Sequence, residues 1–545
     1  MRRGLIEGEY RFSEAEVARN VEAGYWSREV LTDALSRTAK ATPDRVAIVD
    51  RKGQMTYGRL AELVERLAGA FAKLGVKPGD RVTIQLPNWH EGLAVHFALE
   101  RVGAVTVPLP PIYRAKEVGY ILGLTEAKVA VVVSAFRGFD FLEMVQTLWA
   151  SSPALEKIVV VQGDPSAAAP DDRIVSFERL LADDAAPAPA YKHDPNVLME
   201  IAFTSGSTGD PKGVTHTSNT LLVADRSPIA AVNLTEKDVH FIPSTIGHQL
   251  AYTSAVRTPV LLGGKVVFLE HWDPAKAVEL ISREGVTFML TTPTFLNDIL
   301  DSPLLAQHGN LPTLRAWIVA GGVVPSVLIE RAKVLLPHTT LGFAFGMTEL
   351  GPFLMNFDGG PEKGSAAGRL HAGAELRILG PDGEDVGLDT DGEMAAQSPG
   401  LFMGYYRRPD LDALCFTTKS YFTTGDQVRI DADGYVSVTG RIKDLVKRGG
   451  ENISPTEIEE MLFRHPSVSD VAIIGLPDVR LGERICAVVV PKPGTTPPTL
   501  QDLAAWVLAQ GAAKQKCPER LELMDVLPKT PVGKVHKPTL RKMFG

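Results

Sequence analysis

The chain has 545 residues, too many for one hydrophobic core, so we expect two or more domains. Its 45% hydrophobic and 22% charged residues are typical of an ordinary globular protein. The 57 basic and 65 acidic residues give a formal net charge of −8, which argues against nucleic-acid partners and against a polybasic membrane anchor.

The termini and the cysteines bear on location. The start, "MRRGLIEGEYRFSEAEVARN", is charged and lacks the apolar core of a signal peptide. No apolar run approaches the roughly 18 residues of a membrane helix. Cys415, Cys486 and Cys517 are widely spaced and form no metal-ligand pattern. We therefore expect buried thiols in a reducing compartment, and a cytoplasmic protein without a membrane partner.

The first part of the chain alternates between helical and strand patterns. Residues 57–75 carry apolar side chains at helical spacing and stop at "VKPGD". Strands and one further helix follow in turn, at 81–88, 91–102 (the helix), 104–109, 127–135 and 157–163. This βαβα order predicts parallel sheets with helices on both faces.

Residues 163–196 are rich in Ala, Pro and Asp, which predicts a surface connection. Strand patterns then resume at 264–272, 286–294 and 314–322. Near residue 440 the pattern changes, from a hairpin-like "DADGY" to a dense run of Lys, Arg and Gly. The helices and strands beyond it fill about a hundred residues, enough for a small α+β domain. They are predicted at 454–466 (helix), 468–477, 483–492, 499–510 (helix) and 519–528.

The segment "FTSGSTGDPKG" (203–213) concentrates glycines and hydroxyls directly after the apolar run "VLMEIAF". These residue types suit a flexible surface turn. They also suit a phosphate cradle, in which backbone N–H groups, hydroxyls and a lysine converge on one anion. The GxxxxGK[ST] spacing of a P-loop is absent from it. Composition alone leaves both interpretations open.

Four later segments decide between them: "FGMTE" (345–349), "YFTTGD" (421–426), "GRIKDLVKRGGENI" (440–453) and "PKTPVGK" (528–534). Singly, they could be a helix start or simple turns. Together, in this order, the five resemble the adenylate-forming (ANL) superfamily of acyl-CoA synthetases, aryl-acid ligases, nonribosomal adenylation domains and firefly luciferase. The resemblance extends from about Trp26 to Lys534.

The resemblance implies an α/β fold. Its large N-terminal domain, residues 1–442, would consist of stacked αβ subdomains with mostly parallel sheets. A small mobile α+β C-terminal domain would cover residues 443–545. The implied reaction is attack of a carboxylate on the α-phosphorus of ATP, which gives an acyl-adenylate and pyrophosphate.

The resemblance also assigns roles toward ATP. Lys534 would bridge the two reacting anions with its flexible ammonium group. Glu349 would bind Mg²⁺, which prefers carboxylate oxygens, and Thr348 would touch the α-phosphate. Asp426 would accept hydrogen bonds from both ribose hydroxyls, and Arg441 would hold ribose or phosphate oxygens. The loop that binds the β- and γ-phosphates would consist of Thr204, Ser205, Gly206, Ser207, Thr208, Gly209 and Lys212.

In this family the small domain rotates between two steps. Lys443 lies at the position of the hinge. The rotation would withdraw Lys534 and bring in Gly449 and Gly450, past which the pantetheine arm of coenzyme A would run. The coenzyme A thiol attacks the adenylate, so no cysteine is given a catalytic role. Acetylation of Lys534 by an acetyltransferase, reversed by a deacetylase, would remove the charge that adenylation needs.

The implied acyl pocket has uncharged walls, which argue against a dicarboxylate or an amino acid and favour an apolar acid. They are His248, Gln249, Tyr252, Gly321, Gly322, Gly346, Met347, Leu350 and Phe353. The chain resembles cyclohexanecarboxylate–CoA ligase and, less closely, the 2,3-dihydroxybenzoate–AMP ligases, which have asparagine where Gln249 stands. We therefore expect a CoA ligase for a cyclic, non-hydroxylated acid, with benzoate-like or medium-chain fatty acids as close alternatives.

Two other interpretations stay open. The enzyme could load a carrier-protein thiol instead of coenzyme A. A nucleotide-binding module without catalysis is a third, which the intact Lys534, Glu349 and phosphate loop disfavour. Nothing in the sequence points to luciferase-type oxygenation.

Overall fold

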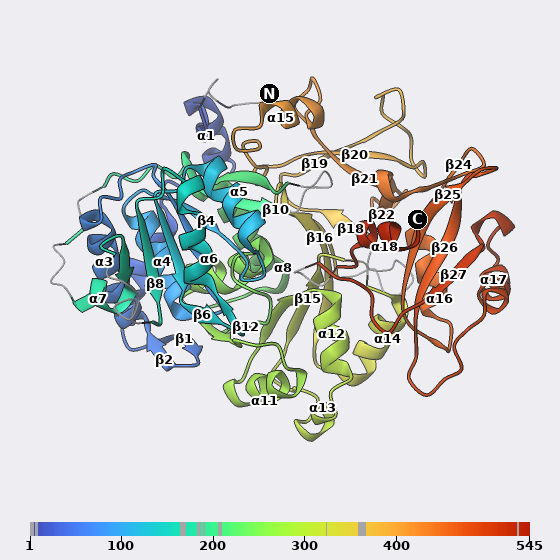
Figure 1. Cartoon of the computed structure of the whole chain (residues 1–545), viewed down its shortest axis with the longest axis horizontal. Coiled ribbons are helices and arrows are strands. Elements are labelled where there is room, and N and C mark those ends of the chain that lie inside the picture. Colours follow the sequence, from blue (N-terminus) through green and yellow to red (C-terminus); the bar gives the residue numbers. More distant parts are fainter. Residues whose placement is uncertain are drawn as a thin grey trace.

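The computed structural model describes residues 5, 9–163, 171–182, 187–188, 191–204, 210–322, 324–357, 367–530 and 534–545. It forms a large N-terminal part built on two sheets and a small C-terminal part built on a third (Figure 1). The expected α/β architecture with a small α+β C-terminal domain is confirmed. None of the helices in these ranges is long and apolar enough to cross a bilayer.

The first sheet has seven strands and is parallel except for one edge. Its inner strands include fully buried β-branched runs such as "VAVVV" of β5, as expected for parallel strands covered on both faces. In spatial order they are β11 (Lys212–Thr217), β10 (Leu198–Thr204), β4 (Val105–Pro108), β3 (Arg81–Gln85), β5 (Val129–Val133), β8 (Lys157–Val161) and β9 (Ile174–Ser176).

The second sheet has thirteen strands and changes character along its length. From β1 to β16 the neighbours are parallel, and from β16 to β19 they are antiparallel. In spatial order the strands are β19 (Glu375–Leu379), β20 (Gly392–Gln397), β21 (Phe422–Ile430), β22 (Val436–Arg441), β18 (Ala367–Leu370), β17 (Gly351–Asn356), β16 (Thr340–Met347), β15 (Ala316–Ala320), β14 (Phe288–Thr291), β12 (Val239–Ile242), β13 (Lys265–Phe268), β1 (Val46–Asp50) and β2 (Gly53–Thr56).

Helices cover these sheets. α4 (His90–Arg101) is buried along almost its whole length, so it lies inside the fold, whereas α3 (Tyr57–Lys73) buries one face. The other helices are α1 (Glu14–Glu22), α2 (Leu31–Ala41), α5 (Ala115–Thr125), α6 (Phe141–Thr147), α7 (Phe177–Ala182), α8 (Ser218–Val232), α9 (Gln249–Ala251), the π-helix η3 (Tyr252–Arg257), α10 (Thr258–Leu262), α11 (Pro274–Glu284), α12 (Pro293–Leu300), α13 (Leu304–Gln307), α14 (Ser326–Leu335) and α15 (Pro409–Cys415).

The small domain packs helices against a five-stranded sheet. A short 3₁₀ helix, η5 (Ile442–Asp444), leads into it from β22. Its elements are β23 (Val446–Arg448), β24 (Glu451–Ile453), α16 (Pro455–Phe463), β25 (Val468–Asp478), β26 (Gly482–Pro491), α17 (Leu500–Ala509), β27 (Arg520–Leu523) and α18 (Lys537–Phe544). Each helix and strand expected here from the sequence is present.

One sequence expectation needs correction. Residues 163–196 were expected to be a surface connection, yet the described part of this stretch contains β9 and α7. β9 pairs in parallel with β8 and extends the first sheet by one strand. Its three residues are too short a run to produce a recognisable strand pattern among Ala, Pro and Asp.

Candidate functional site

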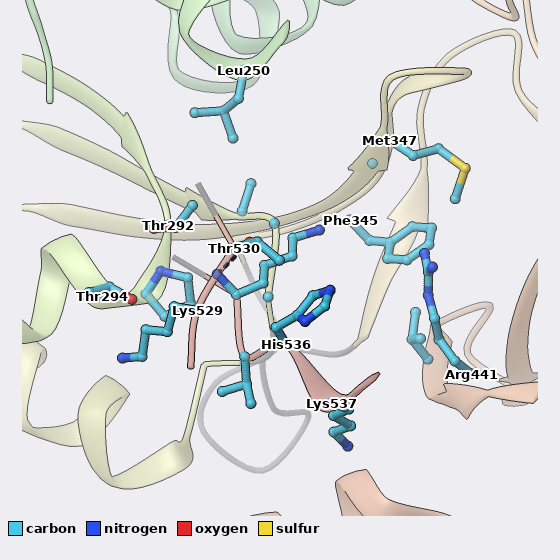
Figure 2. Close-up of a pocket in the computed structure, with 18 of the residues that line it drawn as sticks. Leu250, Thr292, Thr294, Phe345, Met347, Arg441, Lys529, Thr530, His536 and Lys537 are labelled. Atoms are coloured by element: carbon cyan, nitrogen blue, oxygen red, sulfur yellow. Dashed lines mark hydrogen bonds between the residues drawn. The ribbon is translucent and has the colours of Figure 1, made fainter. Parts of the chain in front are cut away.

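A cavity of about 2250 Å³ lies between the large and small domains. Its walls include the ends of β10, β15, β16 and β21, together with α16 and the last segment of the chain. Figure 2 shows Thr530 and His536 of that segment lying between Thr294 on one side and Phe345 and Arg441 on the other. The two domains therefore enclose one shared space.

Glu349 lies in the turn between β16 and β17, on the cavity wall. Its side chain is buried, and its Oε1 accepts a 2.8 Å hydrogen bond from the Tyr405 hydroxyl. Burial raises the pKa of Glu349, while Tyr405 and the charges of Arg441 and Lys212 act in the opposite direction. A further cation beside Glu349 would stabilise the charged form of this carboxylate and lower its pKa.

Thr348, beside Glu349, is fixed through its backbone. His216 Nε2 lies 2.7 Å from the Thr348 carbonyl oxygen, and His216 Nδ1 lies 3.0 Å from Thr220 Oγ1. A carbonyl only accepts, so His216 Nε2 carries a proton and donates it to the Thr348 carbonyl oxygen. The His216 ring thus holds the β16–β17 turn in place from β11.

Asp426 and Arg441 face each other across the β21–β22 pair. Arg441 Nε donates to Asp426 Oδ1 at 2.7 Å. Asp426 is only 2% exposed, and its Oδ2 is buried without a hydrogen-bond partner in the described ranges. Burial raises the pKa of Asp426, and Arg441 partly offsets this. A buried carboxylate oxygen without a hydrogen-bond partner costs free energy, and a ligand hydroxyl could supply the missing hydrogen bond.

The ends of the glycine-rich segment also reach this region. Thr204 ends β10 and Lys212 begins β11, and the two are paired in an antiparallel register. Both line the cavity, and Lys212 Nζ lies 5.0 Å from the centre of the Tyr405 ring. Five of the predicted phosphate-loop residues lie outside the described residues: Ser205, Gly206, Ser207, Thr208 and Gly209.

Lys534 enters the cavity from the small domain. Its backbone is held by Thr530, whose N–H donates to the Lys534 carbonyl at 2.7 Å. Its side chain reaches the large domain, because a Cβ added to Gly321 would lie 3.6 Å from Lys534 Cε. Loss of water inside the cavity lowers the pKa of Lys534, and Arg441 lowers it further, against the effects of Asp426 and Glu349.

One wall of the cavity is apolar. Leu250, Leu290, Ile318, Ala320 and Ala344 all line it and pack in a single hydrophobic cluster. Six of the predicted acyl-pocket residues also line the cavity: His248, Gln249, Gly321, Gly322, Gly346 and Met347. Burial, and then the charge of Lys534, lower the pKa of His248 to about 4, so this imidazole is neutral near pH 7.

Three of the predicted acyl-pocket residues lie elsewhere. Tyr252, Leu350 and Phe353 are at most 2% exposed and belong to the hydrophobic core rather than to the described cavity wall. Tyr252 faces away because the π-helix η3 turns it toward the His96 ring, 5.0 Å away. Spacing along the sequence gave no sign of this rotation.

The remaining predicted residues lie on the small-domain side. Lys443 is in η5 and lines the cavity, and burial followed by Arg441 lowers its pKa. Gly449 and Gly450 form the exposed turn between β23 and β24, with φ of 60° and 90°, and are not among the described lining residues. Positive φ at both positions explains the pair of glycines.

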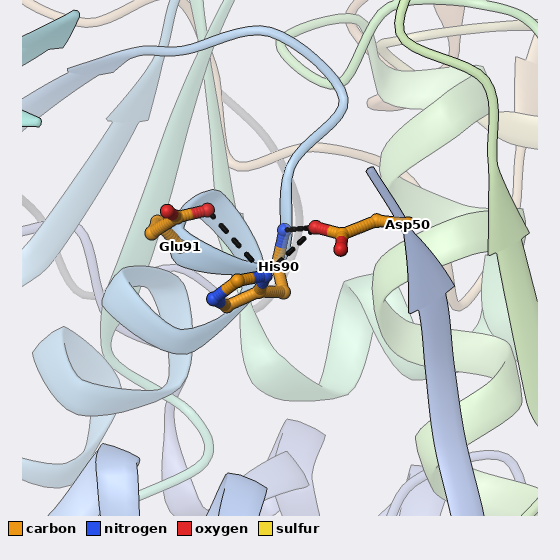
Figure 3. Close-up of side chains that lie close together, drawn as sticks. All are labelled: Asp50, His90 and Glu91. Atoms are coloured by element: carbon orange, nitrogen blue, oxygen red, sulfur yellow. Dashed lines mark hydrogen bonds and ion pairs between the residues drawn. The ribbon is translucent and has the colours of Figure 1, made fainter. Parts of the chain in front are cut away.

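A second cluster of ligand-type side chains lies outside the cavity (Figure 3). Asp50 ends β1, and His90 and Glu91 begin α4; His90 Nδ1 is 2.7 Å from Asp50 Oδ2. Glu91 already pairs with Lys52 at 2.6 Å and with Arg51 at 3.2 Å. These two cations already neutralise Glu91, so the cluster joins β1 to α4 as an ion-pair network.

Comparison with known proteins places the chain in a family. The AMP-binding enzyme family matches residues 35–406, and the AMP-binding enzyme C-terminal domain matches residues 457–534. The chain is 32% identical to a medium-chain fatty-acid–CoA ligase of Escherichia coli, over 97% of this chain and 93% of that protein. It is 33% identical to a salicyl-AMP ligase / salicyl-S-ArCP synthetase of Mycobacterium tuberculosis, over 99% and 95% of the two chains.

Among solved structures, the anthranilate CoA ligase AuaEII in complex with anthranoyl-AMP superimposes with a TM-score of 0.85. The identity is 25%, and the match covers 95% of this chain and 97% of that one. The chain belongs to the adenylate-forming superfamily of acyl-CoA ligases and aryl-acid AMP ligases. It is an AMP-forming ligase that uses ATP to activate an acid for transfer to coenzyme A or a carrier.

Proposed function

We propose that this enzyme activates an apolar cyclic carboxylic acid, such as cyclohexanecarboxylate, as its acyl-adenylate and transfers the acyl group to coenzyme A. The observation that carries the proposal is one cavity in which Lys534, Glu349, Asp426 and Arg441 meet an apolar wall. A substrate whose ring lies on that wall would direct its carboxylate group toward Lys534 and Arg441.

Each polar residue then has a separate task. The Lys534 ammonium bridges the carboxylate and the α-phosphate oxygens as negative charge builds between them. Asp426 Oδ2 accepts from the ribose, and Arg441 keeps the other oxygen of Asp426 engaged. Thr348 is positioned for the α-phosphate by His216. Thr204 and Lys212 flank the loop that receives the terminal phosphates.

Glu349 fits a magnesium ion, because it is a buried carboxylate whose pKa is raised by lost water and would be lowered by a cation. The ion would add positive charge beside the phosphates. Tyr405 orients the Glu349 carboxylate by donating to Oε1.

Two ion pairs support a pivot at Ile442 and Lys443, and hence domains of residues 1–442 and 443–545. On one side of the pivot, Arg441 is tied to Asp426 of the large domain. On the other side, Asp444 accepts from Arg541 of α18 at 2.9 Å. Rotation there would withdraw Lys534 and bring Gly449 and Gly450 to the coenzyme A thiol.

Acetylation of Lys534 remains part of the proposal as a means of control. The ammonium group lies inside the cavity between the domains. Full activity after stoichiometric acetylation of Lys534 would contradict this control.

The substrate has two close alternatives. A medium-chain fatty acid would use the same apolar wall, and a medium-chain ligase is among the relatives. An aryl acid delivered to a carrier protein has equal support from the salicyl-AMP ligase. Pyrophosphate release across a panel of carboxylates, with and without coenzyme A and with products identified by mass spectrometry, separates the three. A pyrophosphate signal that stops at the adenylate and ignores coenzyme A would favour the carrier.

The division of labour is tested with Lys534→Ala. We expect adenylate formation to fall at least 100-fold, since a bridging charge of this kind stabilises the transition state by roughly 3 kcal/mol or more. Reaction of a synthetic acyl-adenylate with coenzyme A should continue. Lys542→Ala, an exposed lysine of the same segment, is the matched control. Equal loss of both half-reactions in Lys534→Ala would overturn the assignment.

A further inference from the structure

The first turn of α14 in the large domain is completed by side chains of the small domain. Residue Ser326 begins α14, and Pro325 before it supplies no side-chain cap. Glu460 Oε1, on α16 of the small domain, accepts from the Ser326 N–H at 3.1 Å. Arg464 donates to Ser326 Oγ at 2.8 Å. The helix end is thus capped by the other domain.

This contact should stabilise the first turn of α14. The N–H groups of a helix's first turn have no partner within the helix, and a carboxylate there accepts a hydrogen bond and complements the helix dipole. Glu460 also lies 3.4 Å from Arg464, with partly exposed side chains. An exposed ion pair of that kind contributes little alone, so the stabilisation comes from the two bonds to Ser326.

The same helix is fixed to the segment that carries Lys534. Glu459, next to Glu460, pairs with Lys537 Nζ at 2.7 Å and accepts from the Ile473 N–H at 2.8 Å. Lys537 begins α18, three residues after Lys534. A continuous set of contacts therefore runs from α14 of the large domain through α16 to the lysine in the cavity.

We propose that Glu460, with Arg464, is a clasp that selects the domain orientation in which Lys534 lies in the cavity. Glu460 is then a positioning residue for adenylation and has no part in the transfer to coenzyme A. The inference rests on the proposed function, because it assigns the two steps to two orientations. When the small domain rotates, the clasp opens and water replaces Glu460 at the helix end.

The test uses Glu460→Gln in the full-length enzyme. The amide keeps the size of the side chain and loses its charge, so the orientation that favours adenylation becomes less populated. The glutamine oxygen can still accept from the Ser326 N–H, so we expect the adenylation rate to fall roughly 2- to 5-fold, the effect of a lost negative charge at a helix N-terminus. The rate from a synthetic acyl-adenylate and coenzyme A should be unchanged or higher. Glu457→Gln, on the same helix but paired with Lys516 within the small domain, should change neither step.

Ser326→Pro tests the partner of Glu460. Proline is well tolerated at the first position of a helix but has no N–H to donate. We expect it to lower adenylation at least as much as Glu460→Gln, because it removes the N–H that Glu460 accepts from and also the hydroxyl that accepts from Arg464. Adding Glu460→Gln to Ser326→Pro should then cost less than Glu460→Gln costs in the wild type, because the N–H that Glu460 contacts is already gone. Equal losses in both half-reactions, or fully additive effects, would overturn the clasp.

Hydrogen exchange keeps this test independent of the substrate. In the ligand-free enzyme, backbone amides in the first turn of α14 should exchange faster in Glu460→Gln than in wild type or in Glu457→Gln. Unchanged exchange would overturn the clasp even if the proposed substrate is correct. Failure of the wild-type enzyme to adenylate any acid in the panel would instead contradict the proposed function alone.

Discussion

Asp426 illustrates how the two oxygens of one buried carboxylate can have different surroundings. Its Oδ1 is paired with Arg441, and its Oδ2 has no hydrogen-bond partner in the described ranges. Burial of half a carboxylate without a partner destabilises the free enzyme. A ligand hydroxyl that donates to this oxygen would gain a hydrogen bond and so favour binding. The arrangement therefore favours ligand binding at some cost in the stability of the protein alone.

We expect Asp426→Asn to lower kcat/KM for ATP by roughly 10- to 100-fold, the effect of losing a charged hydrogen bond. The amide has one acceptor oxygen where the carboxylate has two, and its NH₂ group would oppose Arg441. Initial rates of pyrophosphate release against ATP concentration measure this. Asp391→Asn, which alters an ion pair with Arg429 outside the cavity, is the control. A normal kcat/KM in Asp426→Asn would exclude the ribose contact.

At the scale of elements, the π-helix η3 contributes Thr253 to the wall of the cavity. Arg257 at its end is fully buried and pairs with Asp225 of α8 at 3.0 Å and with Glu200 of β10 at 3.1 Å. Arg257 Nη2 also donates to Thr253 Oγ1, and Thr253 lines the cavity. Burial raises the pKa of Asp225, and the charge of Arg257 acts in the opposite direction.

Arg257→Met should destabilise the protein strongly, by about 3–5 kcal/mol, because it leaves two buried carboxyls without their cation. Chemical denaturation with urea measures the change. Arg226→Met, at an exposed position on the neighbouring helix, should change stability by less than about 0.5 kcal/mol. A small effect for Arg257→Met would mean that both carboxyls are protonated in the folded state.

The elements that the sequence predicted well have strong local patterns. The helix expected at 57–75 is α3, whose one buried face gives apolar residues at helical spacing. The strand expected at 127–135 is β5, whose burial on both faces gives a short continuous apolar run. Apart from the hairpin at "DADGY", which joins β21 and β22, the antiparallel half of the large sheet was not predicted. Its order depends on pairings between distant strands, such as β18 with β22, which no local period encodes.

The sequence motifs identified those candidate-site residues that lie within a motif. Residues that come near the site only through the folding of the chain were missed. Lys534, Glu349, Asp426 and Arg441 share one cavity, as the resemblance implied. Tyr405 was missed, because it is 56 residues from Glu349 and stands in no motif that links the two. The sequence also gave no sign of the bond between Glu460 and Ser326, 134 residues apart.

For the whole molecule, the pivot between the domains is short. Arg441 is extended, with φ −109° and ψ 129°, and η5 begins at Ile442. Ion pairs hold the residues on either side, Arg441 to the large domain and Asp444 to α18. A rotation of the small domain must therefore be absorbed by very few backbone dihedrals.

The substitution Ile442→Pro tests whether the proposed rotation occurs at these dihedrals. An extended residue before proline and a 3₁₀ position for proline itself are both favourable, so the orientation seen here should be kept. We expect adenylation within about 3-fold of wild type and transfer to coenzyme A slowed at least 10-fold, because one of the dihedrals that must turn is fixed. Single-turnover measurements of each step test this, with Ile442→Val as control. Normal transfer in Ile442→Pro would place the pivot elsewhere.

The parallel pairing of β1 with β13 has a consequence for how the chain acquires its structure. Arg45, just before β1, donates to the Gly263 carbonyl, 218 residues away. β2 follows β1 directly in the chain and pairs with one of its edges. At synthesis rates of about 5–20 residues per second, the other edge of β1 waits on the order of 10–40 s before β13 exists. Pairing over such separations slows folding, so this edge of an apolar strand stays open to aggregation during that interval. The yield of active enzyme should therefore depend on temperature and on chaperones during synthesis more than on the final stability of the fold.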